Sequence, residues 1–395
     1  MAKRIYVGVG NTARRVKKAY VGINGLARRI KRAYIGVGGV ARILYTTELD
    51  YWGCAKPLSL ANFHPAATSN SKYALFAGGY NITTNKSYSR VEAYSKSLTK
   101  VSAPDLDNEC SDPVSASLDN VSLFSYGSPG CINAYDLSLT KSTVTEGNEN
   151  KYREGMRGAR IGNYAAFVDG VTYSGNKWIA AKCIDTYDAS LTYSQKGQCY
   201  GRYYHSVVFN GTHTVVAGGQ EDWNTGGYST WDLDFAEAFD LSFTRTIIDK
   251  LSKKREGMAA VAVGKYILFM GGEDIRAISV DDRYESEIYD VVDAYDDSLT
   301  RISAPPLSHT LVCSTHYDTI CATVIHNQYA LVPLGENLPI DVYDSALTKT
   351  TCGKLSRSNV SATTIDDYAL FAGGSYSSGK YTFQTDSVDV YAYMQ

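Results

Sequence analysis

The stretch that decides the fold is an apolar run closed by two glycines, Tyr266-Ile267-Leu268-Phe269-Met270-Gly271-Gly272. Similar runs recur along the chain, and each ends on a glycine at the same place: Gly79, Gly127, Gly170, Gly219, Gly272, Gly335 and Gly374. An aromatic residue follows each glycine after a variable gap: Tyr94, Tyr135, Tyr187, Phe239, Tyr295, Tyr343 and Tyr391. Repeats of roughly 50 residues made of short strands are typical of β-propellers, in which each repeat forms one four-stranded sheet. We therefore predict an all-β chain with seven blades.

Each repeat is expected to hold four strands, here named a to d in chain order. Strand b is the glycine-ended run, strand c ends on the aromatic residue, and strand d follows a nearly uniform turn such as Ser97-Leu98-Thr99. We expect the glycine at a crowded position, where a side chain would collide with the neighbouring blade.

The last repeat is incomplete, because the chain stops at Gln395 before a strand d. The missing piece is found near the other end. Residues 54–59 match residues 303–308, which run from the end of strand d of the fifth repeat into the segment after it, in spacing. We predict that this N-terminal segment supplies the outer strand of the seventh blade and closes the ring, which removes an open sheet edge.

Composition excludes several classes of protein. No apolar run approaches the length of a membrane span, and the N-terminus lacks the apolar core and cleavage site of a signal peptide. The eight cysteines show no C-x-x-C spacing, which argues against a zinc or redox site. We therefore expect no metal, no cofactor and no membrane insertion.

A second, shorter repeat precedes the propeller. Its 14-residue copies cover residues 3–16, 17–30 and 31–44, and each reads as two short strands around a turn. The turn pairs are Gly10-Asn11, Asn24-Gly25 and Gly38-Gly39. Such pairs tolerate positive φ and favour tight β-hairpins. We predict two parts, a β-hairpin repeat arm over residues 1–44 and a propeller over residues 45–395.

The arm is strongly basic, whereas the rest of the chain is acidic. Residues 1–44 hold eleven Lys or Arg and no acid, whereas the remaining residues hold 28 basic and 41 acidic side chains. This asymmetry predicts docking of the arm on an acidic protein surface. Binding of nucleic acid is the rival interpretation, and solubility alone is a third. The residues expected to dock are Arg14, Arg15, Lys17, Lys18, Arg28, Arg29, Lys31 and Arg32.

Variation in the propeller is concentrated on one face. The b–c and d–a connections of a propeller emerge on the same face, and here the b–c loops differ greatly in length while the c–d turns are nearly uniform. Aromatic rings among carboxylates can bind carbohydrates or protein epitopes. The alternative is that these polar loops serve only the solubility of the surface. The candidate ligand-binding residues are Trp223, Tyr228, Trp231, Asp232, Arg276, Arg283 and Tyr284.

A register of arginines adds a second candidate. Eleven residues before strand b, four of the seven repeats carry an arginine: Arg153, Arg202, Arg255 and Arg357. A ring of guanidinium groups at the channel mouth would bind an acidic ligand. The alternative is that these arginines bridge adjacent blades through backbone carbonyls.

Evidence for catalysis is thin. The six histidines show no metal-ligand spacing, and the chain has no Gly-x-Ser-x-Gly elbow and no P-loop. Paired acids such as Asp281-Asp282 do not fix the separation that a glycosidase needs. We therefore expect a protein that is not an enzyme.

The propeller repeats resemble the kelch family of β-propellers over about residues 48–395, through the glycines after strand b and the aromatic residue in strand c. They depart from that family because repeats two, three and six keep only the second glycine and the Trp usual in strand d is missing. The arm resembles the basic Tyr-Val-Gly-Val repeats in tail and particle proteins of bacteriophages that infect Gram-positive hosts.

These resemblances imply a virion structural protein, assembled in the host cytoplasm and oligomeric on the particle. Its arm would contact other virion proteins, and its propeller would bind a host surface glycan or protein. An intracellular kelch adaptor that binds an acidic peptide is one alternative, and a carbohydrate-active enzyme is another.

Overall fold

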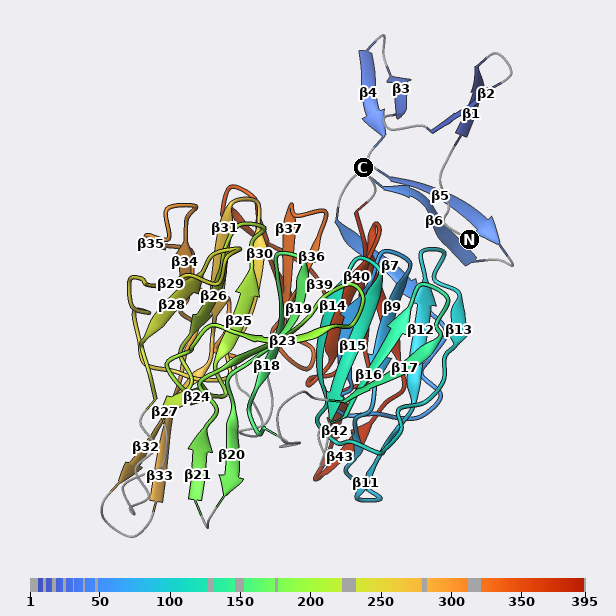
Figure 1. Cartoon of the computed structure of the whole chain (residues 1–395). Coiled ribbons are helices and arrows are strands. Elements are labelled where there is room, and N and C mark those ends of the chain that lie inside the picture. The colour runs from blue at the N-terminus through green and yellow to red at the C-terminus, as the bar shows by residue number, and fades with distance from the viewer. Residues whose placement is uncertain are drawn as a thin grey trace.

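The computed structural model describes residues 49–126, 131–145, 153–174, 177–221, 232–278, 283–311 and 321–393, together with the strands of the first 46 residues. Seven four-stranded antiparallel sheets follow one another around a ring, and no helix occurs in this part of the chain (Figure 1). The predicted seven-bladed propeller is confirmed.

The strands run a to d within each blade, and blade 7 takes its last strand from the N-terminal side of the chain. Blades 1 and 2 are β8 (Ala66–Ser69), β9 (Tyr73–Ala77), β12 (Val91–Ser95) and β13 (Lys100–Ser102), then β14 (Val114–Leu118), β15 (Val121–Tyr126), β16 (Cys131–Asp136) and β17 (Lys141–Thr145). Blades 3 and 4 are β18 (Arg157–Ile161), β19 (Tyr164–Val168), β22 (Ile184–Tyr187) and β23 (Tyr193–Lys196), then β25 (Ser206–Phe209), β26 (Thr214–Ala217), β28 (Ala236–Phe239) and β29 (Arg245–Ile247). Blades 5 and 6 are β30 (Ala259–Val263), β31 (Tyr266–Met270), β34 (Val292–Tyr295) and β35 (Arg301–Ser303), then β36 (Thr323–Ile325), β37 (Tyr329–Pro333), β38 (Pro339–Asp344) and β39 (Lys349–Lys354). Blade 7 is β40 (Ser361–Ile365), β41 (Tyr368–Ala372), β44 (Val388–Ala392) and β7 (Asp50–Cys54).

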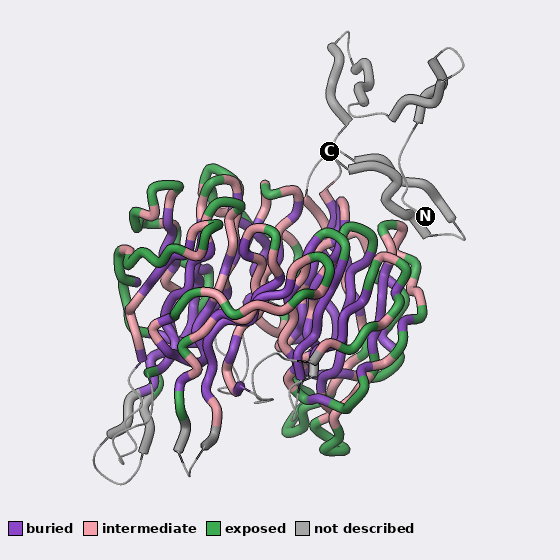
Figure 2. Tube along the Cα trace, in the orientation of Figure 1, coloured by how far each residue is buried: buried purple, intermediate pink, exposed green. Residues whose placement is uncertain are grey.

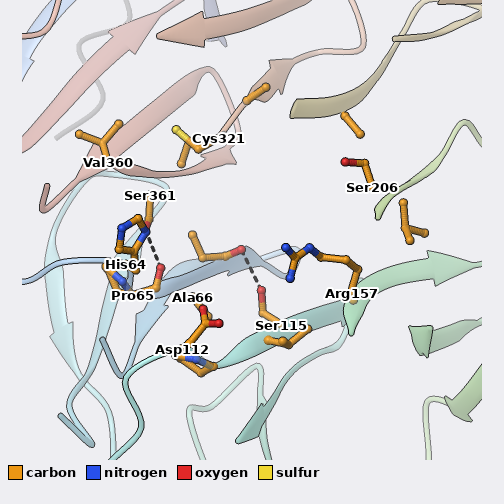
Figure 3. A pocket seen from close by; sticks show the side chains of 18 of the residues that line it. His64, Pro65, Ala66, Asp112, Ser115, Arg157, Ser206, Cys321, Val360 and Ser361 are labelled. Carbon is orange, nitrogen blue, oxygen red and sulfur yellow. Dashed lines mark hydrogen bonds between the residues drawn. The ribbon is translucent and has the colours of Figure 1, made fainter. Parts of the chain in front are cut away.

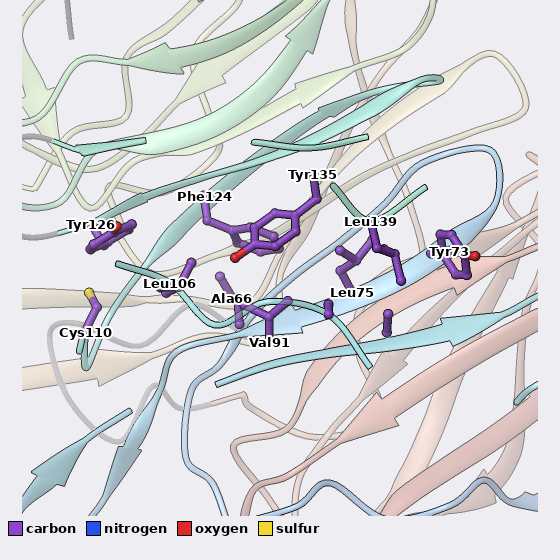
Figure 4. Close-up of a cluster of buried hydrophobic side chains, with 13 residues drawn as sticks. Ala66, Tyr73, Leu75, Val91, Leu106, Cys110, Phe124, Tyr126, Tyr135 and Leu139 are labelled. Atoms are coloured by element: carbon purple, nitrogen blue, oxygen red, sulfur yellow. The ribbon is translucent and has the colours of Figure 1, made fainter. Parts of the chain in front are cut away.

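The hydrophobic core is divided into clusters, one between each pair of neighbouring blades. Figure 2 shows that the buried residues lie along the strands of the ring. Figure 4 shows the cluster between blades 1 and 2, where Leu75 and Val91 of blade 1 meet Phe124 and Tyr135 of blade 2. The phenylalanine of strand b and the tyrosine of strand c meet edge to face, with ring centroids 5.9 Å apart for Phe124 and Tyr135. The same pair recurs in blades 1, 3, 5 and 7. This explains why the aromatic residue repeats in the sequence, since aromatic pairs favour that geometry.

The tyrosine of strand c also joins its blade to the preceding one. The hydroxyl of Tyr295 donates to the carbonyl of Asp249 at 2.8 Å, just after strand d of blade 4. Equivalent bonds are made by Tyr94, Tyr135, Tyr343 and Tyr391. Blade 4 has Phe239 at this position and therefore lacks the hydroxyl.

The uniform c–d turns hold a bulky residue in a left-handed conformation. Leu139 has φ 61°, and the turns of blades 1, 3, 4, 5 and 6 repeat this with Leu98, Leu191, Phe243, Leu299 and Leu347. Such a conformation is unfavourable for a branched side chain. It is tolerated because Leu139 packs into the core shared with the preceding blade. In addition, the Asp136 carboxylate accepts backbone N–H groups from Ser138 and Thr140, each at 2.8 Å.

The two glycines after strand b serve different contacts, which refines our expectation. A Cβ at the first glycine, Gly78, would lie 2.7 Å from Pro113, at the entry to the next blade. A Cβ at the second, Gly272, would lie 2.5 Å from the carbonyl oxygen of Glu256, in the segment that enters its own blade. The repeated glycine therefore meets two needs: its own blade's backbone comes close to it, and at Gly272 the backbone has a φ of 94°, which glycine adopts easily.

The N-terminal segment closes the ring as predicted. Strand β7 pairs antiparallel with β44, and Asp50 lies opposite Ala392. Ala55 N–H continues the contact to Val388 O at 2.9 Å, and Trp52 packs on Tyr368 with ring centroids 5.9 Å apart. Because strand c ends where the c–d turns begin, the chain enters the propeller on the face that carries those turns.

The predicted hairpins of residues 1–44 are present in the backbone. β1 (Tyr6–Val9) pairs with β2 (Thr12–Arg15), β3 (Ala19–Ile23) with β4 (Leu26–Ile30), and β5 (Arg32–Val37) with β6 (Val40–Thr46). Of the residues predicted to dock, the five arginines lie on these strands: Arg14, Arg15, Arg28, Arg29 and Arg32. Lys17, Lys18 and Lys31 lie outside the described residues. Docking itself stays a prediction.

Candidate binding face and central cavity

One face of the propeller is extended by small two-stranded ribbons in the b–c connections (Figure 1). They are β10 (Tyr80–Asn81) with β11 (Lys86–Ser87), β20 (Val171–Ser174) with β21 (Lys177–Ala180), β32 (Glu273–Ile278) with β33 (Arg283–Ile288), and β42 (Ser375–Ser378) with β43 (Tyr381–Gln384). In blade 4, β27 (Gln220–Glu221) pairs with β24 (Arg202–Tyr203) in the segment that enters the blade. We call this the ribbon face. It lies opposite the face where the chain enters the ring.

The ribbon of blade 7 carries exposed aromatic rings. Tyr376, Tyr381 and Phe383 are 40%, 72% and 44% exposed, which is unusual for side chains of this size. Tyr376 and Phe383 stack with ring centroids 5.7 Å apart and an angle of 25° between their planes. Sequence reasoning missed this group, which we call the aromatic ribbon.

The aromatic ribbon is held against blade 1. The side-chain amide of Gln384 donates to the carbonyl of Tyr80 at 2.9 Å, and its oxygen accepts the N–H of Ile82 at 3.0 Å. Ile82 is itself 43% exposed. Blades 7 and 1 thus present neighbouring apolar side chains on a surface fixed at its base.

Several predicted ligand-binding residues cannot be placed against this face. Trp223, Tyr228 and Trp231 lie outside the described residues. Arg276, Arg283 and Tyr284 lie on the ribbon β32–β33, where the backbone pairs Ile278 with Arg283 and Ala277 with Tyr284. Their ligand contacts stay predictions.

Asp232 is placed differently from our expectation of a surface contact. Its side chain is buried, and its carboxyl Oδ2 accepts the N–H of Ile275 at 2.5 Å. Burial, followed by the nearby Glu256 carboxylate, raises the pKa of Asp232 to about 8. The residue thus joins the b–c segment of blade 4 to the ribbon of blade 5, which is a structural role.

The four arginines of the repeated register are also buried, which corrects the expectation that they ring the channel mouth. Each pairs with the acid two residues before the aromatic of strand c in its own blade: Arg153 with Asp185, Arg202 with Glu237, Arg255 with Asp293, and Arg357 with Asp389. They also donate to backbone carbonyls in or beside strands b and c, as Arg202 does to Phe235 O, just before strand c, at 2.9 Å. This geometry fits the structural alternative, except that the carbonyls belong to the same blade. Asn62 takes the same position in blade 1, with its amide donating to Gly78 O at 2.7 Å.

One buried group has the composition of a metal site. Ligand atoms of Asp169, Cys199 and Glu237 lie within 4.8 Å of one another. However, the Glu237 carboxylate already accepts Arg202 Nη2 and Arg245 Nε, each at 2.5 Å. Burial keeps the Cys199 thiol protonated by raising its pKa, and raises the pKa of Asp169 to about 7. Two guanidinium groups thus take the place of a metal cation, and the group does not fit one.

A cavity of about 290 Å³ lies on the ring axis, at the end of the channel next to the ribbon face (Figure 3). Its wall is formed mainly by the first residues of the a strands. Most of these are small, and three hydroxyls join neighbouring blades: Ser361 Oγ donates to Pro65 O at 2.6 Å, Ser115 Oγ donates to Ala67 O at 3.0 Å, and Ser206 Oγ donates to Met258 O at 2.7 Å. Arg157 and Asp112 are the charged residues of the described lining. Sequence reasoning missed Arg157, although small residues occupy the equivalent positions of the other six blades: Ala66, Val114, Ser206, Ala259, Cys321 and Ser361.

Within the described residues, no helix has the length and apolar character required to cross a membrane.

Comparison with known proteins supports the fold alone. No family model matches the chain, and no curated protein matches it in sequence. Among solved structures, one described as "Structure of YjhT" is similar with a TM-score of 0.53 at 9% sequence identity, covering 84% of this chain and 99% of that one. This likeness agrees with the β-propeller fold of the chain, while its resemblance to the kelch family stays a prediction.

Proposed function

We propose that this chain is a non-enzymatic virion component, whose basic arm anchors it to a particle and whose ribbon face binds a host surface glycan or protein. The observation that carries the proposal is that the chain enters the propeller on one face and the ribbons lie on the opposite face. The chain enters the ring at Asp50, beside the c–d turns, whereas the ribbons extend from the other face. An anchor on one side leaves the opposite side free to meet a host surface.

The aromatic ribbon supplies the chemistry of recognition. Tyrosine and phenylalanine rings offer broad apolar planes that stack on sugar rings or pack in protein interfaces, and the tyrosine hydroxyls add hydrogen bonds. Tyr381 is the most exposed of the large apolar side chains in the described residues, at 72%. Aromatic residues exposed in this way are common anchors of binding surfaces.

The arm supplies the attachment. Its eleven basic residues and absence of acids favour an acidic partner surface, and hairpins that are marginal alone gain stability by packing on a partner. The resemblance of its repeats to those of bacteriophage particle proteins supports a virion partner and copies arranged as an oligomer on the particle. An intracellular kelch adaptor would need no such arm.

The experiment separates the two surfaces. A Tyr376→Ala, Tyr381→Ala, Phe383→Ala variant of the full chain should lose at least tenfold in binding to host cells or to a glycan array, since truncating a hot-spot aromatic costs about 2 kcal/mol or more. The matched control replaces exposed apolar residues elsewhere, Leu241→Ala and Ile247→Ala, which are 53% and 66% exposed. Equal binding by both variants would remove the aromatic ribbon as the recognition surface.

The arm is tested on particles. A chain lacking residues 1–44 should be missing from purified particles, whereas the full chain should be detected there by mass spectrometry. Absence of the full chain from particles would refute the virion role, and normal incorporation of the shortened chain would refute the arm as anchor.

A further inference from the structure

The face of the propeller that carries the a–b and c–d turns, which we call the turn face, bears a ring of carboxylates. Five of its six c–d turns begin with an aspartate at the same position: Asp136, Asp188, Asp240, Asp296 and Asp344. Each uses Oδ1 to hold its own turn, as Asp240 does by accepting the N–H groups of Ser242 and Thr244, each at 2.8 Å. All five are at least partly exposed, and none makes an ion pair with another described residue.

The rest of the turn face adds more acids than bases. Its turns together hold nine aspartates and three lysines, Lys72, Lys96 and Lys265. Two of the aspartates are paired, Asp119 with Arg160 at 2.9 Å and Asp367 with His326 at 2.8 Å. The basic residues that begin the d strands are paired with acids of their own blade or of the preceding connection: Lys100 with Glu92, Lys141 with Asp107, Arg245 with Glu237, Arg301 with Asp293, and Lys349 with Asp341. The turn face therefore keeps a net negative charge.

A hollow of about 360 Å³ opens on the turn face between blades 2 and 3. Its wall includes Asp119 and Asp188 together with the ring of Tyr164. The Lys196 Nζ already lies 3.8 Å from the centre of that ring, as expected where an aromatic face attracts a cation. Since Arg160 pairs with Asp119, Asp188 is the carboxylate of this hollow that a further cation would meet.

The same chain contains a segment of opposite charge. Residues 1–44 hold eleven Lys or Arg and no acid, and the chain enters the propeller at Asp50, on the turn face. Leu49 packs on the core between blades 6 and 7, and β6 ends at Thr46. The third hairpin is therefore tethered within about 10 Å of these two blades, given the reach of an extended chain. The hollow lies across the ring from that point.

We propose that the turn face binds the basic arm of a neighbouring copy of this chain. Opposite charges bring the two surfaces together, and an arginine fork pairs well with a carboxylate that has an oxygen to spare. Hairpins that are marginal alone gain stability on such a surface. The neighbour's arm, unlike the tethered third hairpin of the same chain, can approach the hollow from outside the ring.

The contact joins two different surfaces, the arm of one copy and the turn face of the next, so it is heterologous and repeats from copy to copy. A closed ring of such contacts can leave every ribbon face on the same side. The inference rests on the proposed function only in treating the arm as a docking segment; it names the partner of the arm and needs no particle.

The test is sedimentation velocity of the purified full chain over a range of protein concentrations, without particles. The natural chain should associate at low ionic strength and dissociate as sodium chloride is added, because salt screens charges at a surface. The combined variant Asp136→Asn, Asp188→Asn, Asp240→Asn should associate at least tenfold more weakly. Asparagine keeps the Oδ1 acceptor that holds each turn and removes only the charge, so the melting temperature should stay that of the natural chain.

The matched control removes three exposed acids from the d–a and b–c connections, with Glu109→Gln, Glu287→Gln and Asp386→Asn. It should associate like the natural chain. The reciprocal variant, Arg14→Gln, Arg15→Gln, Arg28→Gln, Arg29→Gln, should weaken association at least tenfold, and it leaves the propeller unchanged should the turn variant fail to fold.

A full chain that stays monomeric at every concentration at low salt would overturn the proposal, because docking of the arm on its own propeller predicts that result. Loss of association in the arm variant but not in a folded turn variant would place the arm on another surface and also overturn it. Association in solution by a chain that is absent from particles would refute the virion role and leave this inference standing.

Discussion

Removal of the closing segment should open the ring, whereas removal of the arm should not. A chain lacking residues 1–59 loses β7 and the segment that follows, but a chain lacking residues 1–44 keeps both. Leu58 is 4% exposed, and loss of a buried leucine side chain costs about 2–3 kcal/mol. Five backbone groups of residues 55–59 bond to blades 1 and 7, at about 1 kcal/mol each. When the packing of Trp52 on Tyr368 is included, the free energy of unfolding should fall by about 8 kcal/mol. That is a large part of the roughly 5–15 kcal/mol that stabilises a typical domain.

The assay compares thermal unfolding of the two shortened chains by circular dichroism and their aggregation by light scattering. We expect the chain lacking residues 1–44 to melt like the full chain, and the chain lacking residues 1–59 to melt far lower or to aggregate through its exposed edge. A synthetic peptide of residues 49–62 should restore the lost stability, and the same peptide with Leu58→Asp should not. Equal melting temperatures for the two shortened chains would refute the reasoning.

Three further predictions concern single side chains. Arg202→Met should lower the free energy of unfolding by about 3 kcal/mol in denaturant titrations, because it leaves Glu237 buried with one guanidinium fewer; a loss below about 1 kcal/mol would contradict a structural role. Tyr295→Phe should cost about 1 kcal/mol by removing the bond to Asp249 O, and an unchanged midpoint would show that the bond contributes nothing. Burial raises the pKa of Asp169 from 3.8 to about 7, so the folded chain holds a proton that the unfolded chain releases. The stabilisation is therefore complete below about pH 4 and is lost as pH rises through about 7, and Asp169→Asn should flatten that slope; an identical pH profile in the variant would count against it.

The repeat pattern was enough to predict the ring. The glycine after strand b and the aromatic residue of strand c mark contacts that every blade must make, so they recur at a fixed place. The match between residues 54–59 and residues 303–308 predicted the closing strand for the same reason, since both segments begin at the last residue of a strand d and lead toward the next blade.

The role of the repeated arginines was harder to predict, because their spacing shows that they occupy equivalent positions but not whether their side chains are buried. A second signal was present in the sequence. Blades with an arginine also carry an acid two residues before the aromatic, as Glu237 precedes Phe239 and Asp293 precedes Tyr295. Charges that recur together at fixed positions in a repeat indicate a pair within the repeat.

The features that belong to one blade alone were missed, because a repeat pattern says nothing about them. The aromatic ribbon has Tyr376 and Phe383 on paired strands, and its exposure depends on how the ribbon leaves blade 7. Arg157 replaces a small residue of the a strands, and only the ring places that position on a cavity. Departures from the repeat are thus where function is expected.

The direction of β7 has a mechanical consequence. If the arm is fixed to a particle while the ribbon face holds a host cell, tension enters the propeller at Asp50 and runs along β7 toward Cys54. Its hydrogen bonds to β44 are then loaded together in shear, rather than opened one after another from an end. Rupture under load is governed by the rate of unfolding and not by the free energy at rest. In that arrangement the strand that completes the ring would also transmit force between the two attachments, and its detachment would set how long the link lasts.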